Sequence, residues 1–214
     1  MKFTIFLTAI MIAVFGYQII YVPDIAAFFN TYGFSGKNMI DRPYTILTSI
    51  FVHGGLTHLL SNILVMLFFG MAVEKELGWR KMLAIFFLGA AAGDLLSLVA
   101  YPFDAVAVGA SAGIFALIGA GILVKPFDLS FYPFIVPLPL AFVGISYALY
   151  NVYGFLFDAG SNISYAGHFG GFFVGLIFGF RRQGLGRSLK IIILSLIAVL
   201  LVPIILAFLR RLMK

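Results

Sequence analysis

The sequence predicts an all-α membrane protein, built as a bundle of transmembrane helices. Of its 214 residues, 63% are hydrophobic and only 10% are charged, and the mean hydropathy is +1.11. A soluble domain carries about 25% charged residues, so this chain cannot cover its own surface with polar groups. Seven apolar runs follow one another along the chain, each long enough for a bilayer crossing or a packed helix within one. They cover about residues 3–21, 57–73, 81–100, 111–124, 134–153, 166–180 and 188–209.

The first run follows a single lysine and has no small-x-small cleavage site after it, so it is predicted to be a retained helix rather than a signal peptide. Residues 22–56, which come next, are rich in aromatic and apolar side chains but are interrupted by Pro, Gly and Asn. This segment is too apolar for an ordinary solvated loop and too broken for a span. We expect it to lie partly embedded at the membrane interface.

Small residues recur at every fourth position in the fourth and sixth runs. The positions are Ala112, Ala116 and Ala120 in the fourth run, and Gly167, Gly171, Gly175 and Gly179 in the sixth. Such stripes let helix backbones approach closely in lipid. Plain packing explains most of these residues, and it predicts that the fourth and sixth helices lie unusually close together.

Prolines mark the last runs. The stretch "YPFIVPLPLAF" (132–142) holds three of them, which argues against a regular start of the fifth helix. Pro203 lies inside the seventh run, where the helix either crosses the membrane or bends and fails to cross fully. We expect a core over residues 1–180, with a basic loop and a hydrophobic helix over residues 181–214.

The distribution of Lys and Arg predicts a cytoplasmic N-terminus. The outer loops then hold only Lys37 and Arg42, although a complete seventh crossing would also place Arg210, Arg211 and Lys214 outside. The inner segments hold Lys2, Lys75, Arg80, Lys81, Lys125, Arg181, Arg182, Arg187 and Lys190. The chain is therefore predicted to be a multi-pass protein, and its compactness favours a plasma membrane.

Composition also excludes several kinds of site. There is no cysteine, so disulfides, thiolate nucleophiles and cysteine-bound metals are excluded. The net charge of +6 is dispersed between apolar runs, which argues against a nucleic-acid partner. Three histidines without clustered carboxylates make a poor metal site, so neither a metal nor another cofactor is predicted.

Polar residues inside the runs are costly in lipid and are therefore functional candidates. They are His58 and Asn62 in the second run, Asp94 in the third, Ser111 at the start of the fourth and His168 near the start of the sixth, with His53 just before the second. Under the predicted orientation, three separate helices bring His58, Ser111 and His168 to one depth near the outer face.

Each candidate also has a structural explanation. Ser111, within "VAVGASAGIFAL" (106–117), could cap a helix, pack as a small residue or act as a nucleophile. The histidines and Asn62 could simply join helices, and Asp94 could pack, relay protons or face an aqueous cavity. Taken together, His168 could serve as the base for Ser111, and His58, Asn62 and the Ser111 N–H could stabilise an oxyanion. No acidic partner for His168 is evident, so a dyad is predicted rather than a triad.

Four segments resemble motifs of the rhomboid intramembrane serine proteases. They are "HGGLTHLLSN" (53–62), "VEKELG" (73–78), "GASAGIFAL" (109–117) and "AGHFGGFFVG" (166–175). All occur in the order of the family, and the resemblance covers roughly residues 40–180. It implies a six-helix bundle, to which this chain adds a seventh C-terminal helix.

The resemblance also implies roles for single residues. Ser111 would be the nucleophile and His168 its general base and acid, while Asn62 and His58 would line the oxyanion hole. Phe115 occupies the position whose ring stacks on the catalytic histidine. Gly109 and Gly171 are supporting positions of these motifs. The implied partners are membrane lipid and transmembrane protein substrates, which are cut near their outer ends.

Two positions depart from the family pattern. Ala112 stands where the second glycine of G-x-S-G is usual, which puts the oxyanion geometry in question. Tyr44-Thr45 stand where many members have Trp-Arg, which puts the anchoring of the first loop in question.

Three functions are compatible with these features: an active protease, a non-catalytic relative that binds or escorts membrane helices, and a small transporter. Inactive relatives typically lack the serine, the histidine or both, so Ser111 and His168 favour the protease. A transporter is disfavoured because there is no clear inverted repeat and little intramembrane charge beyond Asp94. The substrate and the oligomeric state stay open.

Overall fold

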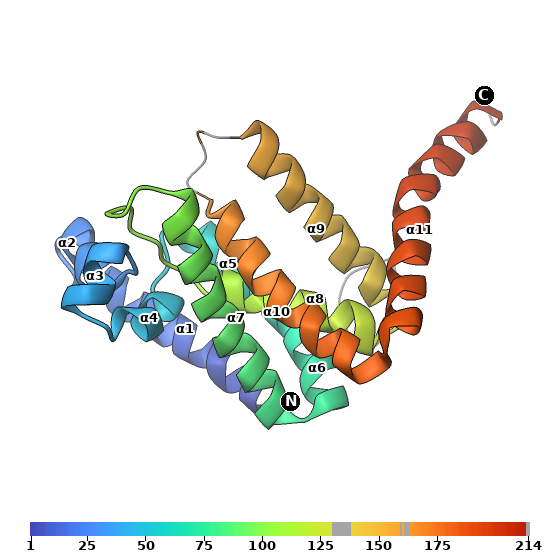
Figure 1. Cartoon of the computed structure of the whole chain (residues 1–214). Helices are drawn as coiled ribbons and strands as arrows, with labels where there is room; N and C mark the ends of the chain where they lie inside the picture. Colours follow the sequence, from blue (N-terminus) through green and yellow to red (C-terminus); the bar gives the residue numbers. More distant parts are fainter. Residues whose placement is uncertain (130–137, 159, 161–162, 213–214) are drawn as a thin grey trace.

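Long helices account for all seven apolar runs of the sequence (Figure 1). The structure is a computed structural model that describes residues 1–129, 138–158, 160 and 163–212. The long helical segments are α1 (Lys2–Tyr21), α5 (Leu56–Val65) continuing through the π-helical turn η2 (Met66–Gly70) into α6 (Met71–Leu77), α7 (Trp79–Ala100), α8 (Ser111–Val124), α9 (Leu140–Phe157), α10 (Tyr165–Gln183) and α11 (Leu185–Leu212). Short helices are α2 (Ile25–Tyr32), α3 (Gly36–Asp41), α4 (Thr45–Thr48) and η1 (Ser49–Phe51).

The prediction of an all-α membrane protein is confirmed. Among the described residues, five helical segments are long and apolar enough to cross a bilayer: α1, α5 to α6, α7, α9 and α11. The fourth apolar run of the sequence forms α8, a shorter apolar helix of 14 residues. The fifth run was expected to begin near residue 134. The helix begins at Leu140, directly after Pro139, and residues 130–137 lie outside the described part of the chain.

The central helix of the bundle is α8, in which every residue from Gly113 to Val124 is buried. Two glycines of α10, Gly171 and Gly175, meet the backbone carbonyls of Ala112 and Ala116 so directly that a Cβ on either glycine would collide with them. The predicted close packing of these two helices is therefore confirmed. Its cause is the absence of side chains along the shared face.

The start of α1 is held by a carboxylate from α6. Glu74 is buried, and its oxygens accept hydrogen bonds from the N–H of Thr4 at 2.9 Å, the hydroxyl of Thr4 at 2.6 Å and the N–H of Phe3 at 3.2 Å. A negative charge at a helix N-terminus also interacts favourably with the helix dipole. This contact fixes the first helix against the end of α6.

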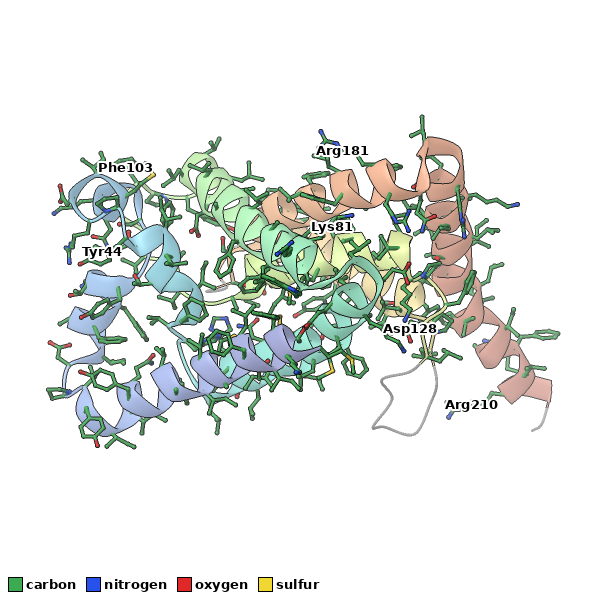
Figure 2. The ribbon with its side chains drawn as sticks, turned by 90° about the horizontal axis from the view of Figure 1, so that it is seen from below. Tyr44, Lys81, Phe103, Asp128, Arg181 and Arg210 are labelled. Atoms are coloured by element: carbon green, nitrogen blue, oxygen red, sulfur yellow. The ribbon has the colours of Figure 1, made fainter. Side chains whose placement is uncertain are left out.

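The segment between α1 and α5 folds into α2, α3, α4 and η1 at one end of the bundle (Figure 1). It is fastened to the loop between α7 and α8, because the N–H groups of Phe34 and Ala107 donate to each other's carbonyls at 2.9 and 2.7 Å. Tyr44 and Phe103 lie at this end, away from Lys81 and Arg181 (Figure 2). The segment therefore holds the loop that leads into Ser111.

The last helix, α11, stays helical through Pro203. No residue of its apolar stretch is fully buried, although Ile191, Ile192, Leu196 and Val199 pack partly against the core. Its C-terminal half projects away from the other helices (Figure 1). Such a surface is suited to lipid.

Candidate active site

Ser111 and His168 face each other across the junction of α8 and α10. Nε2 of His168 lies 2.8 Å from Oγ of Ser111. Ser111 is the first residue of α8, and His168 lies in the first turn of α10. The two side chains meet because Gly171, one turn further along α10, lets its helix touch the backbone of Ala112. A serine hydroxyl within hydrogen-bond distance of an imidazole nitrogen is an arrangement that can generate a nucleophile.

The other ring nitrogen of His168 contacts a residue that the sequence analysis did not single out. Nδ1 lies 2.7 Å from Oδ1 of Asn151, which is only 1% exposed and comes from α9. The Asn151 amide nitrogen donates in turn to the carbonyl of Tyr165 at 3.1 Å. The sequence analysis predicted no partner for this nitrogen of His168. The available signal was the cost of an asparagine within an apolar span, which applies to Asn151 as it does to Asn62.

Aromatic rings fix the plane of the imidazole. The ring of Phe115 stacks on His168 with a centroid distance of 4.2 Å and an angle of 10° between the planes. Tyr165 presents its ring at 90° to the imidazole, with centroids 6.4 Å apart. His168 is buried, so these contacts and its two hydrogen-bond partners restrict its rotation.

His58 and Asn62, one helical turn apart on α5, approach the same site through Gly109. A Cβ on Gly109 would lie 2.7 Å from Nε2 of His58 and 3.6 Å from Nδ2 of Asn62. Gly109 also has φ +117°, a conformation that L side chains rarely adopt. Its N–H donates to the carbonyl of Ser49 in η1 at 2.8 Å, which ties the loop before α8 to the segment between α1 and α5. Glycine at this position therefore lets both α5 side chains lie beside the segment that enters Ser111.

Each of these two α5 side chains can offer a hydrogen-bond donor to a further group. Nδ2 of Asn62 is buried and has no partner within the described part of the chain. The N–H of Gly54 donates to Nδ1 of His58 at 3.4 Å, so in the neutral ring the hydrogen is on Nε2, the atom nearest Gly109. Both donors are thus available to a group placed beside Gly109.

His53 lies between η1 and α5, next to His58. Its side chain is completely buried, its carbonyl accepts from the Gln18 amide at 2.7 Å, and its ring lies edge-on to His58 at 5.2 Å. Burial, together with the neighbouring His58, lowers the pKa of His53 to about 4, so this ring is neutral at pH 7. His53 therefore joins α1 to the start of α5.

A small cavity of about 30 Å³ adjoins Ser111 and His168. Polar residues from three segments line it: Ser49 from η1, Asp94 and Ser97 from α7, and Ser164 just before α10. The Ser97 and Ser164 hydroxyls lie 2.8 Å apart, and Oδ2 of Asp94 is buried without a partner among the described residues. The volume and the polar lining are sufficient for a water molecule.

Comparison with known proteins identifies the family of this chain. Residues 41–185, more than half of the chain, match the family described as Rhomboid domain. The chain belongs to the rhomboid family. It is 29% identical over 138 residues to RHOMBOID-like protein 5 of Arabidopsis thaliana, an alignment that covers 64% of this chain and 43% of that protein.

Two relatives carry the word protease in their names. Over 76 residues, which are 36% of this chain, the identity is 36% to Rhomboid-like protease 3 of Toxoplasma gondii and 37% to Putative rhomboid protease YdcA of Bacillus subtilis (strain 168). These alignments cover 28% and 38% of the two relatives. The chain thus spans less than half the length of the rhomboid relatives named here.

The structure accommodates both departures from the rhomboid pattern. The Cβ of Ala112 lies against Gly93 of α7, where a second side chain could not fit, so the extra methyl group is matched by a glycine opposite. In the first loop Thr45 is fully buried and its hydroxyl donates to the carbonyl of Arg42 at 2.9 Å. The neighbouring Tyr44 is exposed at the end of the molecule (Figure 2).

Proposed function

We propose that this rhomboid is an intramembrane serine endopeptidase that cleaves transmembrane protein substrates with a Ser111–His168 pair. The observation that carries the proposal is the 2.8 Å contact between Nε2 of His168 and Oγ of Ser111 at the start of α8. The protease names of two relatives support the same reaction. A serine hydroxyl is a weak nucleophile until an adjacent base removes its proton.

The first half of the reaction forms an acyl-enzyme. Nε2 of His168 takes the hydroxyl proton while Oγ of Ser111 attacks the scissile carbonyl carbon, which becomes tetrahedral and negatively charged at oxygen. When the C–N bond breaks, the imidazolium returns that proton to the leaving amine. Because an intact helix hides its carbonyls in hydrogen bonds, the substrate has to unwind at the cut.

The negative oxygen would be stabilised by donors around Gly109. The candidates are the backbone N–H of Ser111, Nδ2 of Asn62 and Nε2–H of His58, with the partial positive charge of the α8 N-terminus behind them. Among the residues that the structure describes, Asn62 Nδ2 has no partner, which supports this role because such a donor can engage the new charge without breaking an existing bond.

The second half of the reaction needs water. A water molecule in the cavity beside Ser49, Asp94 and Ser97 would lie next to both reacting residues. His168 would remove its proton, the resulting hydroxide would attack the ester carbonyl, and the proton would pass to Oγ of Ser111 as the acid product leaves. The polar lining gives this water partners within an otherwise apolar bundle.

We also propose a plasma-membrane location with a cytoplasmic N-terminus, and cleavage near the outer face. The short helices α2, α3 and α4 lie at one end of the bundle (Figure 1). The support for the orientation is the excess of Lys and Arg in the segments at the other end.

Cleavage of a reconstituted transmembrane substrate in liposomes tests this function. We expect the wild type to cut without added metal, and Ser111→Ala and His168→Ala to abolish cutting while the protein stays folded. Cutting that survives Ser111→Ala would overturn the assignment of the nucleophile. If no form cuts, a serine-directed phosphonate decides: labelling of Ser111 supports a protease given the wrong substrate, and its failure to label supports a helix-binding relative.

A further inference from the structure

We infer that Asn151 is a positioning residue that holds His168 in the one tautomer able to accept the Ser111 proton. This inference rests on the proposed serine chemistry and adds a third residue, from a third helix, to the Ser111–His168 pair. The amide of Asn151 touches His168 on the side away from the nucleophile, so it acts through the imidazole rather than on the substrate.

The orientation of the Asn151 amide follows from its partners. A backbone carbonyl can only accept hydrogen bonds, so the amide atom 3.1 Å from the Tyr165 carbonyl has to be the NH₂ group. The amide oxygen is then the atom 2.7 Å from Nδ1 of His168. Because this oxygen also only accepts, Nδ1 has to carry a hydrogen.

A neutral imidazole has one N–H, so a hydrogen on Nδ1 leaves a lone pair on Nε2. Nε2 is the atom 2.8 Å from the Ser111 hydroxyl, which can then donate its hydrogen to it. In the other tautomer Nε2 would already carry a hydrogen and could not act as the base. The Tyr165 carbonyl on α10 thus orients the Asn151 amide on α9, and this amide determines which nitrogen of His168 can accept the Ser111 proton.

Neighbouring residues hold the Tyr165 carbonyl in place. Gly154 lies one turn after Asn151 on α9, and the ring of Tyr165 occupies the space that a Cβ on Gly154 would fill. The hydroxyl of Tyr165 donates to Oδ2 of Asp158 at the end of α9, at 2.9 Å. Tyr165 is therefore fixed at both its carbonyl and its side chain, and α9 has to be seated against α10 for the tautomer to be set.

An asparagine can orient the imidazole at this depth without burying a charge. A carboxylate would orient the imidazole too, but an ionised group is costly to bury within an apolar bundle. Asn151 accepts from Nδ1 without a charge and uses its second polar group on the Tyr165 carbonyl, so both groups of the buried amide are satisfied.

The test measures the tautomer directly. The chain has three histidines, so ¹⁵N spectra of histidine-labelled protein can be assigned with one His substitution at a time. For the wild type at neutral pH we expect Nδ1 of His168 to give a protonated signal and Nε2 an unprotonated one. Asn151→Leu should give a mixture of tautomers. Asn151→Asp buries a neutral carboxylic acid, whose carbonyl oxygen can face Nδ1 while its hydroxyl donates to the Tyr165 carbonyl, so it should keep the wild-type pattern.

Kinetics on the same variants give a second readout. Losing one such hydrogen bond should lower kcat of Asn151→Leu by about tenfold or more with little change in KM. Asn151→Asp should restore most of kcat. The matched control is Ser146→Ala on α9, because the Ser146 hydroxyl donates to the Phe142 carbonyl of its own helix, at 2.9 Å, and to no other residue that the structure describes.

The inference is overturned if the wild type carries its hydrogen on Nε2, or if Asn151→Leu leaves the ¹⁵N pattern unchanged. It is also overturned if Asn151→Leu and Asn151→Asp lose thermal stability and kcat to the same extent, since that is the signature of a purely structural residue. The spectra need no substrate. A wild type that fails to cut anything would therefore count against the proposed function and leave the tautomer measurable.

Discussion

The two sides of the site differ in how completely their polar groups are used. On the α8–α10 side both nitrogens of His168 have partners, Phe115 covers one face of the ring, and the helices meet backbone to backbone at Gly171. On the α5 side the amide nitrogen of Asn62 is buried without a partner among the described residues, and the His58 ring lies in the space that a Cβ on Gly109 would fill. In the resting protein the polar groups of His168 on the α8–α10 side have hydrogen-bond partners, whereas the Asn62 amide nitrogen on the α5 side has none among the described residues.

The proposed serine chemistry explains this difference. A proton can pass from Ser111 to His168 only if the two atoms are already aligned, so their surroundings have to be rigid before a substrate arrives. The donors of an oxyanion hole serve a charge that exists only during the reaction, so they have to be fixed in place and still unoccupied. An unpartnered buried amide costs about 1–3 kcal/mol of stability, which the folded protein has to tolerate for the sake of the site.

Apart from the reacting pair itself, the largest effect on cleavage should come from removing Asn62, whose amide nitrogen is the donor without a described partner. Asn62→Ala should lower kcat by about 10²–10³-fold, as expected for one oxyanion donor, and leave KM nearly unchanged. Because the variant removes a buried amide nitrogen that no described residue contacts by a hydrogen bond, its melting temperature should be equal to or above that of the wild type. Cleavage kinetics and thermal unfolding in detergent measure both quantities.

His168→Ala is the matched comparison, since it removes a side chain with two partners and should lower the melting temperature. The contrast between the two sides would be refuted by an Asn62→Ala protein that unfolds earlier and cleaves at the wild-type rate.

A somewhat smaller effect is expected from disturbing the α8–α10 side through its packing. A Cβ at Gly171 would collide with the Ala112 carbonyl, so Gly171→Ala should push α10 away from α8 and separate Ser111 from His168. A displacement of about 1 Å at a reacting pair lowers the rate by about 10²-fold, and overpacking costs about 1–3 kcal/mol of stability. Cleavage rate and melting temperature should both fall.

Gly16→Ala on α1 is the control, because a Cβ there meets nothing within 4 Å. Alanine is also favoured over glycine within a helix by about 1 kcal/mol, so this control should be as stable as the wild type or more stable. Equal behaviour of the two variants would show that the α8–α10 contact is not as close as described.

The smallest effect is expected where the chain departs from the rhomboid pattern. Ala112→Gly should change kcat little, since the methyl group of Ala112 already fits against Gly93 on the α7 side of α8. It should lower stability by about 1 kcal/mol, because glycine is unfavourable within a helix. Thermal unfolding beside cleavage kinetics checks this, and a gain in kcat of tenfold or more would mean that Ala112 distorts the oxyanion geometry.

The sequence alone determined the class of protein and the placement of its helices. Lipid leaves a spanning segment no way to satisfy its backbone other than a helix, so apolar runs translate directly into helices, here within a few residues at most ends. The fifth helix differed most among the described residues, because prolines precede Leu140. Polar residues were conspicuous for the same reason, and Ser111 and His168 do lie in contact.

Only the tertiary structure decided what joins those helices and orients the site. The rotation of α9 about its axis determines that Asn151 meets His168, and an apolar pattern in lipid carries little information about rotation because most faces are apolar. The attachment of the first loop to the loop before α8 also depends on backbone hydrogen bonds, which any sequence can make. Composition and periodicity place groups along each helix. The direction in which each side chain points and the distance between helices arise from close packing at Gly171 and Gly93, where the helix backbones touch.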